Sequence, residues 1–100
     1  MNILSSTKGG LFPGDVLFEL KATHGFPLDF ALDLILVGER LVISWVPFIE
    51  AARKNGWWDF QTYQVLCHAM EQAQLPLEMQ AGIKARFQIY VLENPLTRTD

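Results

Sequence analysis

The segment that most constrains this chain runs from Gly25 to Gly38 and reads GFPLDFALDLILVG. Between the two glycines only Asp29 and Asp33 are polar. Pro27 suits the first turn of a helix, where its missing N–H costs nothing, and Gly38 can take the left-handed conformation that ends a helix. A helix that is apolar nearly all round is normally buried, and one of about a dozen residues is too short to cross a bilayer. The segment therefore predicts the buried central helix of a small domain.

Four more helices are expected around this segment, because apolar residues recur at helical spacing over about 15–23, 45–54, 59–74 and 77–93. Ser44 and Asp59 are residue types that cap helix N-termini. Residues 39–43 alternate enough to be extended, and we expect an irregular crossing there or at most a short bridge. In the last helix Gly82 costs roughly 1 kcal/mol relative to alanine, which indicates close approach of another backbone.

These patterns predict one all-α domain, a compact orthogonal bundle of about five helices over residues 13–94. Residues 1–12 are rich in Ser, Thr and Gly and are predicted to be a flexible N-terminal tail, and residues 95–100 a C-terminal tail. Half of the 100 residues are apolar and twelve are aromatic, so a single core can be filled.

Charge and cysteine usage narrow the class of protein. The net charge is −3, and no basic stripe of the kind that nucleic-acid binding usually needs is visible. Cys67 is the single cysteine, so no internal disulfide can form and a reducing compartment is the natural one. The N-terminus lacks a charged segment followed by a long apolar run. We therefore expect a cytoplasmic protein without a membrane partner.

The adjacent tryptophans Trp57 and Trp58 are the first candidate partner-binding residues. Neighbouring side chains point apart, so we expect one tryptophan to pack and the other to be at least partly exposed. Exposed tryptophan is enriched at binding hot spots, and Tyr63, a turn along the next helix, extends the same candidate patch. The alternative is that both tryptophans lie under the N-terminal tail.

Acidic residues form the second candidate group. Asp15 with Glu19, and Asp29 with Asp33, are like-charged pairs at i, i+4 spacing, which destabilise a helix slightly. Asp15 and Asp29 recover that cost at helix N-termini, whereas Glu19 and Asp33 do not. Glu19, Asp29 and Asp33 are therefore candidates for a face that meets a basic partner. A paired-carboxylate acid–base site and a solvated face paired with nearby lysines or arginines remain alternatives.

Enzyme chemistry is not expected from the other polar residues. Cys67 and His68 are sequence neighbours, so on a helix they point about 100° apart and do not face each other as a nucleophile and base would. His24, the other histidine, is expected to cap helix carbonyls. No further ligands stand at metal-site spacing, and no glycine-rich phosphate loop is present, so we predict no metal and no cofactor.

From Gly14 the chain reads GDVLFELKATHGFPLDFA, and this stretch resembles a segment of alanyl-tRNA synthetases. The residues that carry the resemblance are Gly14, Phe18, Leu20, Thr23, Gly25, Phe26, Pro27, Leu28 and Asp29. The family usually has Tyr-Asp where this chain has Lys21–Ala22, and often threonine where it has Ala31. The resemblance implies two helices joined by a tight turn, as in the tRNA-recognition part of those enzymes. The class II signature motifs and the zinc-binding residues of the editing domain have no counterpart here.

Small stand-alone proteins similar to this segment occur in bacteriophages and integrated prophages. Together with the acidity and the missing chemistry, this favours a non-enzymatic protein-interaction module, phage-encoded, that inhibits a host protein, for example an anti-CRISPR or other anti-defence protein. The alternative is a tRNA- or RNA-binding module, which the resemblance supports and the net charge opposes. A homodimer that buries spare apolar surface is compatible with either.

Overall fold

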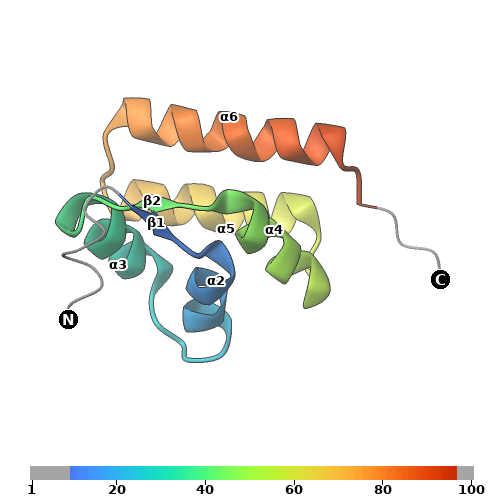
Figure 1. The fold of residues 1–100 in the computed structure, drawn as a ribbon, viewed down its shortest axis with the longest axis horizontal. Coiled ribbons are helices and arrows are strands. Elements are labelled where there is room, and N and C mark those ends of the chain that lie inside the picture. The colour runs from blue at the N-terminus through green and yellow to red at the C-terminus, as the bar shows by residue number, and fades with distance from the viewer. Residues whose placement is uncertain (1–9, 97–100) are drawn as a thin grey trace.

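The computed structural model describes residues 10–96, and over that range the chain is an all-α bundle with one minimal sheet (Figure 1). Its elements are β1 Leu11–Phe12, α2 Gly14–Ala22, α3 Leu28–Leu32, the π-helix η1 Asp33–Gly38, β2 Val42–Ile43, α4 Trp45–Lys54, α5 Asp59–Gln72 and α6 Leu77–Glu93. Because η1 directly continues α3, the described residues form five helical segments, as the sequence predicts. Residues 1–9, most of the predicted N-terminal tail, lie outside the described range, as do residues 97–100.

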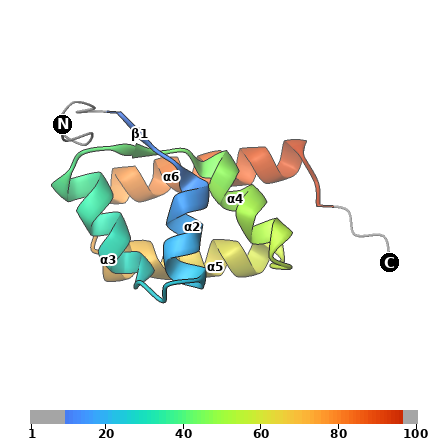
Figure 2. The ribbon, with the colours of Figure 1, turned by 60° about the horizontal axis from the view of Figure 1, so that its bottom comes forward.

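The two longest helices, α5 and α6, run along the long axis of the molecule, and the shorter helices cross them (Figures 1 and 2). α2 packs against α4, α3 packs against α5, and α6 contacts both α4 and α5. The overall extents are 46 × 29 × 24 Å. No helix of the described residues is long and apolar enough to cross a membrane.

The core is centred on α4, which contributes Trp45, Phe48, Ile49 and Ala52 from one face. These four residues stand at i, i+3, i+4 and i+7, so the helical period places them together. Phe48 makes edge-to-face contacts with Phe18 of α2 and with Trp45, at ring-centroid distances of 5.8 and 5.5 Å. The predicted amphipathic face of this helix is confirmed.

A short parallel sheet ties the N-terminal strand to the centre of the chain. β1 pairs with β2 in the register Leu11 to Val42 and Phe12 to Ile43. The hydroxyl oxygen of Ser44, at the N-cap of α4, accepts a hydrogen bond from Gly14 N–H at 2.9 Å and donates one to the Phe12 carbonyl at 3.3 Å. Ser44 therefore occupies the predicted cap position, but its side chain joins α4 to α2 instead of bonding its own helix.

The predicted burial of the central helix is wrong on one side. Leu28, Leu32 and Ile35 are buried, whereas Phe30, Leu34 and Val37 of the same α3–η1 helix are exposed. An apolar helix is buried only where other elements pack on it, and the main neighbours of α3 and η1 are α2, α5 and β2.

The end of this helix also differs from the prediction. Gly38 does not adopt a left-handed conformation; the helix loosens into the π-helix η1, and Arg40 takes the left-handed conformation with φ 58°. The Glu39 N–H bonds the Leu34 carbonyl five residues back at 2.8 Å, which is the π-helical pattern.

Two further predictions from helix chemistry are wrong. A Cβ atom on Gly82 would meet nothing within 4 Å, so the predicted close approach of another backbone to Gly82 is absent. Another backbone does approach Gly14 closely, because a Cβ atom there would lie 2.0 Å from the Ser44 carbonyl oxygen. Trp58, whose backbone is extended, is the N-cap of α5 in place of Asp59, and the Asp59 carboxylate in the first turn binds Arg53.

Candidate protein-binding surface

The strongest candidate surface is the outer side of the continuous α3–η1 helix, which we call the α3–η1 face: Asp29, Phe30, Asp33, Leu34 and Val37. Phe30 is 65% exposed, and Leu34 and Val37 are each about half exposed. Residues at i and i+4 lie above one another on a helix, so Phe30 and Leu34 form one row and Asp29 and Asp33 the row beside it. Three large apolar side chains are therefore flanked by two carboxylates.

A hollow of about 190 Å³ adjoins this face. Its walls are almost wholly apolar and come from β1, α2, the α2–α3 turn and η1, including Phe12, Leu20, Phe26 and Leu34. The Phe26 ring lies 6.3 Å from that of Phe30. The exposed apolar side chains thus continue into a concave surface, which is the usual form of a site that receives a partner's apolar side chain.

Asp33 is exposed and Asp29 is half-buried. Among the described residues the ion pairs are those of Arg53 with Glu50 and Asp59, so neither carboxylate of the α3–η1 face is neutralised by a described cation. The predicted alternative of a pairing with Lys21, Arg40 or Lys54 is not seen. The α3–η1 face therefore carries negative charge at the surface, which favours the binding of a basic partner.

The tryptophans divide as the sequence predicts. Trp57 is half-buried and packs edge-to-face on Phe18, with ring centroids 5.3 Å apart. Trp58 is 51% exposed, and its carbonyl accepts hydrogen bonds from the backbone N–H and the hydroxyl of Thr62. The alternative in which the N-terminal tail covers both tryptophans involves residues 1–9, outside the described range.

Tyr63 lies on the side of α5 that faces α6. Its ring packs on Phe87 at 5.2 Å, and its hydroxyl accepts a hydrogen bond from Gln88 at 3.1 Å. Partial burial, and then the neighbouring Cys67, raise the pKa of Tyr63 above its ordinary value. Tyr63 lines an open apolar groove of about 480 Å³ whose walls include Phe60 and Leu92. Phe60, although apolar and in the first turn of α5, is exposed.

The structure does not gather the six predicted partner-binding residues into one patch. Asp29 and Asp33 stand together on the α3–η1 face, and Glu19 is exposed on the neighbouring helix α2. The α4–α5 turn that carries Trp57 and Trp58 lies at the other end of the long axis in both views (Figures 1 and 2). Tyr63 faces α6, away from both groups.

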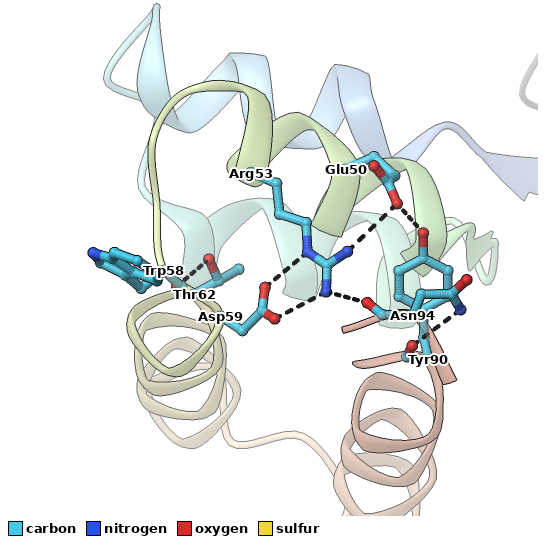
Figure 3. Close-up of polar contacts among 7 residues, drawn as sticks. All are labelled: Glu50, Arg53, Trp58, Asp59, Thr62, Tyr90 and Asn94. Atoms are coloured by element: carbon cyan, nitrogen blue, oxygen red, sulfur yellow. Dashed lines mark hydrogen bonds and ion pairs between the residues drawn. The ribbon is translucent and has the colours of Figure 1, made fainter. Parts of the chain in front are cut away.

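A polar cluster fixes the end of the molecule that carries the tryptophans (Figure 3). Arg53 donates two hydrogen bonds of 2.9 Å to the Asp59 carboxylate and one of 2.7 Å to the Asn94 carbonyl. Its guanidinium also lies 5.6 Å from the centre of the Tyr90 ring, and the Tyr90 hydroxyl donates to Glu50. The hydrogen bonds to Asp59 raise the pKa of Arg53 above its ordinary value. This cluster joins α4, α5 and α6, so its role is structural.

The cysteine and the two histidines lie at separate degrees of burial. Cys67 is half-buried, while His24 and His68 are exposed. Within residues 10–96 no three His, Cys, Asp or Glu side chains form a group that could hold a metal ion.

The exposed apolar residues Phe30, Leu34 and Val37 are the part of the surface that sequence reasoning missed. The signal was partial: Asp29 and Asp33 mark a solvent-facing row that Val37 continues at i+4. Leu28 and Leu32 lie as close in sequence to these carboxylates as Phe30 and Leu34 do, yet they are buried. The apolar composition of the segment outweighed this signal and led to the prediction of a buried helix.

Comparison with known proteins returns one short similarity. An alanine–tRNA ligase from Ehrlichia canis (strain Jake) is 46% identical over 33 residues, which are 33% of this chain and 4% of that ligase. This supports the resemblance of a short segment to the alanyl-tRNA synthetases. No protein-family model matches the chain, and no solved structure matches it significantly.

Proposed function

We propose that this chain is a non-enzymatic protein-interaction module that binds a basic partner protein through the α3–η1 face. The observation that carries the proposal is the exposure of Phe30, Leu34 and Val37 beside Asp29 and Asp33. Exposed apolar side chains that form a contiguous patch are typical of interaction sites, and flanking charges select the partner and its orientation.

The chemistry of the face defines the class of partner. An apolar row flanked by carboxylates complements an apolar pocket rimmed by lysine or arginine. Such rims are common where a protein binds nucleic acid, so an acidic module of this size would compete with the nucleic acid. We therefore extend the proposal to a phage-encoded inhibitor of a host protein, such as an anti-CRISPR or other anti-defence protein. The resemblance to small phage proteins noted above supports this extension.

The test is capture of partners from bacterial lysate by the affinity-tagged chain, with and without ribonuclease. We expect a discrete protein to remain bound to the wild type after ribonuclease. The double variant Phe30→Ser/Leu34→Ser should lose at least nine-tenths of that protein, because both apolar anchors are removed. Asp33→Arg should weaken binding roughly tenfold by placing a positive charge against the basic rim.

Phe60→Ser is the matched control, because Phe60 is as exposed as Phe30 but lies on α5, at the α5–α6 groove. It should leave capture unchanged, and circular dichroism should show equal helicity for all variants. A protein captured equally by wild type and Phe30→Ser/Leu34→Ser, or lost only with Phe60→Ser, would refute the assignment to the α3–η1 face.

A second candidate function, binding of a tRNA acceptor stem, is supported by the similarity to the alanine–tRNA ligase segment. The net charge of −3 opposes it. A complex driven by phosphate contacts weakens steeply between about 50 and 200 mM salt. Captured tRNA with that salt dependence, together with protein bands that vanish after ribonuclease, would favour this second function over the first.

A further inference from the structure

A second surface runs along the side of α6 that faces β2 and α4. Met79, Gly82, Arg86, Ile89 and Glu93 succeed one another at spacings of three and four residues, so they form one stripe along the helix. The stripe borders two adjoining hollows of about 270 and 400 Å³, which share Val42, Ile43, Trp45 and Arg86. The result is a continuous groove beside a helix of 17 residues, about 25 Å long at 1.5 Å per residue.

The wider hollow is surrounded by large apolar side chains that this fold leaves in solvent. Ile89 is 54% exposed, and Leu11, Val42 and Val46 on the opposite wall are exposed to a similar degree. Ile49 of α4 also lines this hollow, as do Arg86, Tyr90 and Glu93 of α6. α6 lies at one edge of the bundle, alongside β2 and α4 (Figure 1).

The charges of the stripe are self-complementary. Arg86 and Glu93 are both exposed, and neither is in an ion pair with another described residue. They stand two helical turns apart with Ile89 between them. In an antiparallel pairing of two α6 helices about a two-fold axis near Ile89, Arg86 of each copy meets Glu93 of the other. A parallel pairing would instead oppose like charges, so the pattern selects the antiparallel arrangement.

We propose that the groove is occupied by a second copy of this chain, giving a two-fold symmetric dimer. Ile89 lies at the centre of the interface and packs against its counterpart, and the Leu11, Val42 and Val46 side chains cover the flanks. Two Arg86–Glu93 ion pairs close the ends. A stable interface buries roughly 800 Å² per partner.

The test is the mass of the full chain in solution by analytical ultracentrifugation. The expected mass is twice the single-chain mass of 11.4 kDa. Arg86→Glu and Glu93→Arg should each weaken dimerisation roughly tenfold, because each change turns two symmetry-related attractions into repulsions. The double variant Arg86→Glu/Glu93→Arg should restore dimerisation to within about threefold of wild type, because the attraction is then re-formed with reversed signs.

Lys84→Glu is the matched control, because it changes the net charge of α6 by the same amount as Arg86→Glu but does not line the groove. It should leave the dimer unchanged. Ile89→Asp should give a monomer with unaltered helicity. A monomeric wild type up to about 1 mM, a dimer that survives both Arg86→Glu and Ile89→Asp, or a double variant as weak as the single ones would overturn the proposal. None of these results depends on the partner protein of the α3–η1 face.

Discussion

At the scale of single residues, two glycines in helices have opposite roles. Gly14 begins α2 where that helix crosses the start of α4, and its missing side chain admits the Ser44 carbonyl and the Phe48 backbone. Gly82 lies within α6 with open space around it. The same residue type is thus required by packing at one position and merely tolerated at the other.

Gly14→Ala should lower the free energy of unfolding by about 3 kcal/mol, because the new methyl group would meet backbone atoms that cannot move aside. Gly82→Ala should raise it by about 0.5–1 kcal/mol, because alanine favours the helix and meets no neighbour. Urea unfolding followed by circular dichroism measures both. Equal effects of the same sign would contradict the packing at the α2–α4 crossing.

At the scale of elements, Arg53 joins three helices at one end of the bundle. It belongs to α4, binds Asp59 at the start of α5, and donates to the Asn94 carbonyl just after α6 (Figure 3). The Arg53 side chain is 11% exposed and the Asp59 side chain 18%. Because both groups are largely removed from water, neither can be rehydrated fully when the other is lost.

Arg53→Met should therefore lower the free energy of unfolding by about 2–3 kcal/mol, because the Asp59 carboxylate and the Asn94 carbonyl lose their partner. Lys54→Met is the neighbouring control: Lys54 is exposed, and this change should cost less than about 0.5 kcal/mol. Chemical denaturation at neutral pH distinguishes them. A negligible effect of Arg53→Met would mean that apolar packing alone holds the three helices together.

At the scale of the whole molecule, the two proposed surfaces are centred on different helices, although Leu36 of η1 lines the hollow beside the N-terminal half of α6. The α3–η1 face lies at one end of the long axis, whereas the C-terminal half of α6 lies toward the other end (Figures 1 and 2). A partner on the first surface leaves the second free. Substitutions in the two surfaces are then expected to act independently, as changes without shared contacts usually do.

We accordingly predict a complex of two copies of this chain with two copies of the partner. Light scattering of the purified complex should show that stoichiometry, and Ile89→Asp should convert it to one copy of each without changing the affinity per site. Phe30→Ser/Leu34→Ser should remove the partner and leave the dimer intact. A partner that binds the monomer but dissociates the dimer would show that the two surfaces overlap.

The sequence by itself determined the helices, because their signals are local. Apolar residues at helical spacing over 45–54, 59–74 and 77–93 predicted α4, α5 and α6 closely, and Pro27 marked a boundary that the structure keeps. Adjacency also predicted that one of the two tryptophans packs and the other is exposed, but only the structure assigns burial to Trp57 and exposure to Trp58.

Tertiary structure alone decided which apolar residues are covered. Phe30 and Leu32 have the same chemistry and sit two positions apart, yet one is exposed and the other fully buried, because only one side of α3 has neighbours. The contact between Gly14 and Ser44 joins residues 30 positions apart, so no local pattern reports it. The α3–η1 face and the α6 groove are apolar surfaces that no further element of the same chain covers.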